Sequence, residues 1–286
     1  MFKGNITSLI TPFKKNGSVD FKSIKKIIEF QCRSGIKNIL INATTGESCS
    51  LNFKEQKRII NFVCKNFHKK IGIMVGSCHN SLEESLKTIK ISKRKEIKAI
   101  LQIIPYYNNP TKKGIVSFFK KICRSTKKPV LIYNVPSRTG FDIDIDTLRE
   151  VFKIDNLIGI KEASKKIDDV IEKIILCKKK GKKFFFGDDL MYISFNNLKV
   201  DGNISVATNI IPKEFKNIKF NLKKIKKIKK ILNVLFIETN PIPLKYIMSK
   251  LGIIKKRLRR PLCSPKKKNK IKIIKVFKKY FKKENK

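Results

Sequence analysis

Residues 130–161 read VLIYNVPSRTGFDIDIDTLREVFKIDNLIGIK, and the architecture of the whole chain follows from this stretch. It begins with the apolar run Val130–Tyr133, continues through the amphipathic segment Ile145–Phe152 and ends in a second apolar run, Leu157–Lys161. Both runs are short and apolar at successive positions, which is typical of strands buried on both faces. The order strand, helix, strand predicts a parallel β-α-β unit.

The same unit recurs along the chain. The candidate strands are Ile6–Ile10, Asn38–Asn42, Ile71–Gly76, Ala99–Ile104, Val130–Tyr133, Leu157–Lys161, Phe184–Gly187 and Gly202–Val206. The amphipathic segments between them are Phe21–Cys32, Phe53–Phe67, Leu82–Ile91, Gly114–Cys123, Ile145–Phe152, Ile167–Cys177 and Leu190–Leu198. Eight units in about 220 residues predict an α/β fold, the closed (β/α)8 or TIM barrel. An open doubly wound sheet is the alternative, but it normally carries a glycine-rich phosphate loop, and this sequence has none.

Local signals support these boundaries. Asn52 followed by Glu55, and Ser81 followed by Glu84, are patterns that begin helices. After Pro212 only helical patterns remain: Ile225–Ile237, Pro241–Leu251 and Ile271–Phe281. We therefore predict a catalytic barrel over residues 1–220 and a C-terminal helical extension with a basic tail over residues 221–286.

The charge of the chain is strongly positive. Lys and Arg number 67 and Asp and Glu 22, a formal net charge of +45 over 286 residues. Such a balance would ordinarily indicate a nucleic-acid partner. The excess is lysine, however, and it accompanies abundant Ile, Asn and Phe, all of which have A/T-rich codons. No aromatic residues alternate with the most basic block, residues 255–270, as base stacking requires. We expect no specific nucleic-acid partner.

Cysteine and histidine usage excludes other classes of protein. The seven Cys and two His residues show neither metal-ligand spacing nor a disulfide framework, so we expect reduced thiols and no metal. The sequence has no signal-peptide pattern at its start and no apolar stretch of the ~20 residues that span a bilayer. We expect a cytoplasmic protein with no membrane partner.

Polar residues at the predicted strand ends are the candidates for chemistry, because the active sites of such barrels lie there. Lys161 directly ends an apolar strand, where burial favours the neutral amine that can attack a carbonyl carbon. The alternative is a structural lysine paired with Glu162 or Asp188. Tyr133 ends the neighbouring strand, and its phenol can move a proton to or from an imine intermediate.

Three further residues follow strand ends. Thr44 and Tyr107 could extend a chain of hydroxyl groups to the phenol, although a turn residue and a rim aromatic are the simpler interpretations. Arg138 lies between Pro136 and Gly140 in a constrained loop, and its guanidinium can hold a carboxylate through two parallel hydrogen bonds.

Together these motifs resemble the pyruvate-dependent class I aldolases, and most closely the dihydrodipicolinate synthase family. The resemblance runs from Phe2 to about Pro261. It is carried by Thr11-Pro12-Phe13, Thr44-Thr45-Gly46-Glu47, Pro105-Tyr106-Tyr107, Tyr133-Asn134-Val135-Pro136-Ser137-Arg138-Thr139-Gly140, Gly159-Ile160-Lys161-Glu162, Gly187-Asp188-Asp189 and Asn240-Pro241-Ile242-Pro243. The Arg-Thr-Gly ending differs from the sialic-acid lyases of the same superfamily.

The resemblance implies an activity: condensation of pyruvate with L-aspartate 4-semialdehyde to 4-hydroxy-tetrahydrodipicolinate, on the diaminopimelate route to lysine. It assigns the Schiff base to Lys161 and proton transfer to Tyr133, with Thr44 and Tyr107 as the relay. It implies no metal or organic cofactor. Tyr107 would come from the neighbouring subunit, which implies a homo-oligomer, usually a tetramer built as a dimer of dimers.

Binding residues are implied in the same way. Thr45 would hold the pyruvate carboxylate and Arg138 the semialdehyde carboxylate, and the backbones of Gly187 and Ile204 would line the pocket. Some family members are inhibited by lysine at the dimer interface. The matching positions, here named the candidate regulatory site, are Ser48, Cys49, Phe53, Gln56, Asn80, Glu84 and Tyr106.

Departures from the family pattern concern this candidate regulatory site. Phe53 and Gln56 stand where regulated enzymes often carry histidines, and Cys78 replaces a common glycine, so we expect weakened or lost inhibition by lysine. Two other functions stay open on the sequence: a keto-acid sugar lyase that uses the same imine, and a basic nucleic-acid-binding protein on a barrel scaffold.

Overall fold

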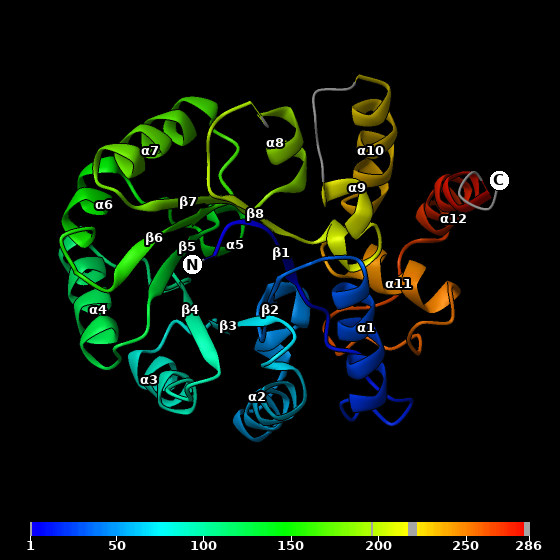
Figure 1. The fold of residues 1–286 in the computed structure, drawn as a ribbon, viewed down its shortest axis with the longest axis horizontal. Helices are drawn as coiled ribbons and strands as arrows, with labels where there is room; N and C mark the ends of the chain where they lie inside the picture. Colours follow the sequence, from blue (N-terminus) through cyan, green and yellow to red (C-terminus); the bar gives the residue numbers. More distant parts are fainter. Residues whose placement is uncertain (1, 196, 217–221, 283–286) are drawn as a thin grey trace.

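The computed structural model describes residues 2–195, 197–216 and 222–282. Within them, eight parallel strands pair in sequence order and the last strand pairs with the first, so the sheet closes into a barrel (Figure 1). The strands are β1 (Gly4–Ser8), β2 (Asn38–Ile41), β3 (Gly72–Ser77), β4 (Ile97–Ile103), β5 (Val130–Asn134), β6 (Leu157–Glu162), β7 (Lys183–Phe186) and β8 (Gly202–Ser205). The predicted TIM barrel is confirmed.

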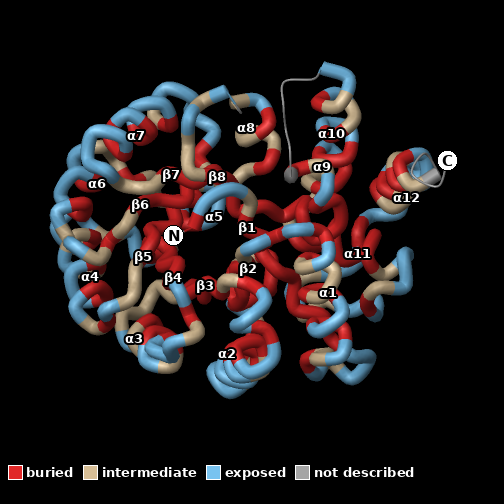
Figure 2. The backbone as a smooth tube through the Cα atoms, in the orientation of Figure 1, coloured by how far each residue is buried: buried red, intermediate tan, exposed pale blue. Residues whose placement is uncertain are grey.

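Helices surround the barrel, with buried residues toward the sheet and exposed residues toward solvent (Figure 2), and their buried apolar side chains join the core clusters. They are α1 (Phe21–Arg33), α2 (Phe53–Phe67), α3 (Leu82–Ile91), α4 (Lys112–Arg124), α5 (Pro136–Thr139), α6 (Ile145–Val151), α7 (Ile167–Lys179) and α8 (Asp189–Ser194). Both predicted helix starts are confirmed. Asn52 and Glu55 form a reciprocal capping box at α2, and the Ser81 side chain accepts a hydrogen bond from the Glu84 backbone at α3.

Alternation along each strand determines which side chains reach the barrel interior. Leu131 and Tyr133 of β5 pack in the interior cluster, whereas Val130 and Ile132 face the helices. Tyr133 pairs in register with Lys161 of β6. The next residues in each strand therefore point outward, away from the interior.

Some boundaries differ from those predicted. Residues 136–139 form the one-turn helix α5 rather than a loop, because Pro136 favours a first helical turn and Gly140 ends it in a left-handed conformation at φ 72°. The helix α4 begins two residues earlier than predicted, because the Thr111 side chain caps it. The helix α8 ends at Ser194, short of the predicted Leu198.

The remaining helices are α9 (Pro212–Lys216), α10 (Leu222–Leu235), α11 (Ile242–Lys250) and α12 (Lys267–Lys282). The last three pack on one side of the barrel, beside α1, in one shared apolar cluster (Figure 1). The predicted domain boundary after residue 220 lies outside the described residues and stays a prediction. In the described part of the chain, no helix is long and apolar enough to cross a membrane.

Candidate active site

A cavity of about 530 Å³ opens at the carboxyl ends of the strands. It brings together residues from the ends of five strands and from the C-terminal extension. The lining residues are Thr44, Thr45, Tyr133, Val135, Ser137, Arg138, Lys161, Ala163, Lys165, Gly187, Asp188, Leu190, Val206, Phe236, Glu238, Thr239 and Asn240. Six of the predicted site residues (Thr44, Thr45, Tyr133, Arg138, Lys161 and Gly187) therefore share one cavity.

Lys161 and Tyr133 lie side by side at the base of this cavity. Both are buried, and Lys161 Nζ lies 3.9 Å from the centroid of the Tyr133 ring. Their register on adjacent strands keeps them neighbours. An amine and a phenol in such contact suit chemistry in which one forms a covalent bond and the other moves a proton.

Gly187, which follows β7, makes room for the Lys161 side chain. A Cβ placed on this glycine would lie 2.9 Å from Lys161 Cε and 3.1 Å from Ala163 Cβ. Both distances are too short for ordinary van der Waals contact. A side chain at this position would therefore displace the Lys161 side chain from the place it occupies here.

Three lysines are buried in the described part of the chain, and they differ in their partners. Lys173 is paired with Asp142 and Glu162, and Lys245 with Glu47. Lys161 has no carboxylate within ion-pair distance among the described residues. The structural alternative, in which Glu162 or Asp188 neutralises Lys161, is wrong. Glu162 faces the opposite side of the sheet, and the Asp188 carboxylate caps α8 by accepting from two backbone N–H groups.

Asn240 connects the two residues expected to bind carboxylates. Its side-chain Nδ2 donates to Thr45 Oγ1 at 3.1 Å, and its backbone oxygen accepts from Arg138 Nη2 at 3.0 Å. The short 3₁₀ turn η1 (Thr44–Gly46) and α5 are thereby held across the cavity mouth by one residue of the extension. The sequence motif that contains Asn240 pointed to this position, but its contacts were not predicted.

The charges around the cavity favour anionic ligands. Three cationic side chains line it, from Arg138, Lys161 and Lys165. The two acidic groups there are already engaged: Asp188 caps α8, and Glu238 accepts from the Lys266 backbone and from Asn269. A carboxylate entering this cavity therefore meets hydrogen-bond donors and cations.

Two predicted site residues lie elsewhere. Tyr107 is 94% exposed, has a left-handed backbone conformation at φ 71° and does not line the cavity of its own chain. Ile204 of β8 is buried in the barrel interior, and Val206, two residues later, lines the cavity instead.

The candidate regulatory site is only partly assembled. Tyr106 and Cys49 interact through their side chains. Burial, and to a smaller extent the neighbouring Cys49, raises the pKa of Tyr106 to about 12. The Asn80 amide donates to the Tyr106 backbone oxygen at 3.3 Å. Gln56 instead points away to the Leu51 carbonyl. The remaining members are a buried Ser48, a partly exposed Phe53, and a Glu84 that is paired with Lys87.

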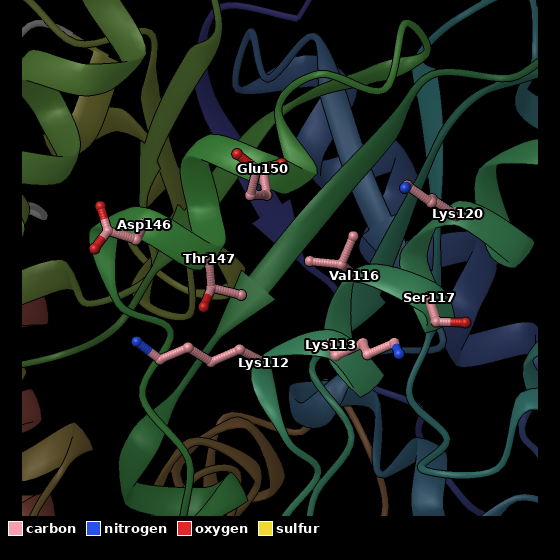
Figure 3. Close-up of a pocket in the computed structure, with 8 residues that line it drawn as sticks. All are labelled: Lys112, Lys113, Val116, Ser117, Lys120, Asp146, Thr147 and Glu150. Carbon is pink, nitrogen blue, oxygen red and sulfur yellow. The ribbon is translucent and has the colours of Figure 1, made fainter.

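A second cavity, of about 440 Å³, lies between α4 and α6 on the outside of the barrel (Figure 3). Three of its charged groups are paired, Lys112 with Asp144, Asp146 with Arg149 and Glu150 with Lys153, and Lys113 and Lys120 also line it. It lacks the buried amine and phenol of the strand-end cavity. Among the residues that the structure describes, no group of three His, Cys, Asp or Glu side chains could hold a metal ion.

Comparisons with known proteins agree with this geometry. A model of the Dihydrodipicolinate synthetase family matches residues 1–280. The chain is 38% identical over 290 aligned positions to a 4-hydroxy-tetrahydrodipicolinate synthase of Hydrogenobaculum sp. (strain Y04AAS1), covering 98% of this chain and 99% of that one.

Two solved structures extend the comparison. A dihydrodipicolinate synthase from Acinetobacter baumannii complexed with pyruvate superposes with a TM-score of 0.91 at 31% identity, covering 97% of this chain and 98% of that one. A monomeric dihydrodipicolinate synthase variant superposes with a TM-score of 0.92 at 31% identity, covering 97% and 96%. The chain belongs to the Dihydrodipicolinate synthetase family.

Proposed function

We propose that this chain is a lyase that condenses pyruvate with L-aspartate 4-semialdehyde to 4-hydroxy-tetrahydrodipicolinate, in the diaminopimelate route to lysine. The observation that carries the proposal is Lys161: it is buried, faces a cation-lined cavity and has no carboxylate partner among the described residues. Both substrates are carboxylic acids, and one has a ketone that an amine can attack. The family to which the chain belongs supports the same reaction.

Lys161 begins the reaction. Its Nζ adds to C2 of pyruvate, water leaves, and a protonated imine forms. The imine withdraws electrons from C3, which loses a proton to give an enamine. The enamine carbon then bonds to the aldehyde carbon of the second substrate, whose oxygen takes up a proton. The amino group of that substrate can displace the lysine from C2, which closes the ring and frees the enzyme.

Proton transfer is the proposed role of Tyr133, because its ring contacts the Lys161 amine at 3.9 Å. Thr44 lines the same cavity and would relay protons to solvent together with Tyr107. Because the exposed Tyr107 side chain lies outside the cavity of its own chain, we propose that it completes the relay of a second copy. This requires at least a dimer, and we expect a tetramer of two dimers.

Substrate binding falls to the residues that Asn240 holds. Thr45 would bind the pyruvate carboxylate and Arg138 the semialdehyde carboxylate, with the backbone of Gly187 and, in place of Ile204, Val206 shaping the pocket. The reaction needs no metal or organic cofactor. The seven free cysteines fit a reducing compartment, and we propose a cytoplasmic location.

The other two functions are not favoured. A keto-acid sugar lyase would share the lysine, but the matching family is that of dihydrodipicolinate synthetase. A nucleic-acid-binding role would leave the buried amine and its phenol neighbour without a purpose.

Trapping tests the proposal directly. Incubation with pyruvate and borohydride should reduce the imine to a stable adduct, which peptide mapping should find on Lys161 alone. Lys161→Ala should abolish the adduct. Lys165→Ala is the matched control, because it removes another cavity lysine and should leave trapping intact. An adduct on Lys165, or none in the unsubstituted enzyme with pyruvate and borohydride present, would contradict the assignment.

A further inference from the structure

A buried charged cluster lies directly behind Lys161 and Tyr133, on the outer face of the same two strands. The residues that follow them, Asn134 and Glu162, pair in register and point toward α7. Asn134 Nδ2 lies 2.9 Å from each Glu162 carboxylate oxygen and 2.7 Å from Asp142 Oδ1. One amide therefore connects two acidic groups.

Lys173 of α7 completes the cluster. It is 1% exposed, and its Nζ lies 2.9 Å from Asp142 Oδ1 and 3.0 Å from Glu162 Oε2. The Ser164 backbone N–H donates to Glu162 at 2.6 Å, and its hydroxyl donates to Asp142 at 3.3 Å. The cluster thus contains two carboxylates and one ammonium, a net charge of −1 behind the barrel wall.

The ammonium form of Lys173 is favoured by its neighbours. Burial lowers the pKa of this lysine, but Glu162 and Asp142 raise it more, and the net direction is upward. A buried group of this kind adds little net stability compared with apolar residues of the same size. Its position one residue behind both reacting side chains indicates a role in the reaction.

We propose that Lys173 is a positioning residue for the imine chemistry. Its charge holds Glu162 against Asn134, which fixes the ends of β5 and β6, and it cancels one of the two negative charges behind Lys161. The inference rests on the proposed function of Lys161.

Other charged groups also face Lys161, and substitution of Lys173 leaves them in place. In the cavity they are Arg138, Lys165, Asp188 and Glu238, beside the phenol of Tyr133. Burial raises the pKa of the nearby Cys78 thiol to about 11 and that of Cys177, on α7 near Glu162, to about 12, so both are neutral in the working range. The buried Asp189 carboxylate is held by Asn203 and two backbone N–H groups.

Removal of the Lys173 charge should shift the pH dependence of imine formation in a defined direction. Burial raises the pKa of Glu162, and at a pH above that raised pKa Lys173→Met, which keeps an unbranched chain, takes the cluster from −1 to −2 and favours the ammonium form of Lys161. Imine formation needs the neutral amine, so its half-maximal pH should rise. One unit charge on the far side of the barrel wall, acting across a partly protein path, gives a shift of about 0.5 to 1 pH unit.

Two more variants separate charge from packing. Asp142→Asn keeps a hydrogen-bond acceptor and the Lys173–Glu162 pair, takes the cluster to zero and should lower the half-maximal pH by a similar amount. The double variant Lys173→Met with Asp142→Asn restores −1 and should return to the original value. Lys183→Met is the control: it breaks an ion pair with Asp201 at the start of β7, at the opposite end of the barrel.

The experiment measures the rate of borohydride-trappable adduct formation with pyruvate across pH, after thermal melting has shown that each variant is folded. Opposite shifts in the two single variants, with reversal in the double variant, support the proposal. The proposal is overturned if the pH profiles do not shift, if both single variants shift in the same direction, or if Lys183→Met shifts equally. If Lys173→Met does not fold, the direction of the shift in Asp142→Asn decides alone. Absence of a Lys161 adduct in the unsubstituted enzyme would instead refute the proposed function.

Discussion

Gly187→Ala should separate the placement of Lys161 from the stability of the fold. The added methyl group would lie 2.9 Å from Lys161 Cε, 3.1 Å from Ala163 Cβ and 3.2 Å from the Glu162 backbone oxygen. The lysine stem is the most flexible of the three and will move most, whereas the other two need yield only a few tenths of an ångström. We expect a loss of about 1–2 kcal/mol in unfolding free energy, the lower part of the range for an overpacked site.

The effect on catalysis should be larger. A displacement of the amine by about 1 Å from its working position can lower a rate by roughly 10²-fold. The assay compares kcat and the rate of pyruvate trapping in Gly187→Ala with those in Gly181→Ala. Gly181 is a suitable control because a Cβ there would have nothing within 4 Å, while its φ of 61° would strain an alanine, so this substitution costs stability far from the cavity. Unaltered trapping and turnover in Gly187→Ala would refute the reasoning.

Four further predictions concern other groups. Tyr133→Phe should lower turnover by about 10² to 10⁴ while pyruvate binding, measured by calorimetry, is kept; unchanged turnover would exclude the phenol as the proton carrier. Arg138→Ala should raise the KM for the semialdehyde and leave that for pyruvate nearly unchanged, and the reverse pattern would contradict the assignment. Lysine titration should give weak or no inhibition, since the amide of Gln56, a member of the candidate regulatory site, is engaged by the Leu51 carbonyl; tight inhibition would overturn this. The hydrogen bond from Arg259 lowers the pKa of Glu55. The pair therefore stabilises the folded state at pH values above the ordinary pKa of a glutamate, and this stabilisation is lost as the pH falls through the lowered pKa. Arg259→Gln should therefore lower the unfolding free energy by about 2 kcal/mol near neutral pH. In urea unfolding experiments, the difference in unfolding free energy between this variant and the unsubstituted protein should become smaller at acidic pH.

The barrel could be predicted because its signals are local. Each strand is a short apolar run and each helix carries its own periodicity, so eight repeats in order determine the topology through pairing of consecutive strands. The same logic placed Lys161 and Tyr133 together, because the last residues of adjacent parallel strands meet at one edge. The cap at Asn52 was equally local, since donor and acceptor are three residues apart.

Contacts between distant segments could not be predicted. The Arg138–Asn240 and Thr45–Asn240 hydrogen bonds join residues 102 and 195 positions apart, and no periodicity carries such a pairing. Lys173 gave one unused signal: it lies on the apolar stripe of α7, three residues after Val170 and four before Cys177. Because the chain contains so many lysines, one lysine on an apolar helix face could not be told apart from the general lysine excess. Only the structure shows the two carboxylates that face it.

The C-terminal extension forms part of the strand-end cavity. One wall of the cavity comes from Phe236, Glu238, Thr239 and Asn240, all beyond the predicted end of the catalytic barrel. Lys245 and Arg259 then anchor this segment to the barrel through Glu47, which ends the turn that carries Thr44 and Thr45, and through Glu55 in the first turn of α2. Because the Lys245–Glu47 pair is buried, its loss would leave an uncompensated charge at the base of that turn. Loss of the extension would therefore remove the contacts that orient both residues proposed to bind carboxylates, Thr45 and Arg138.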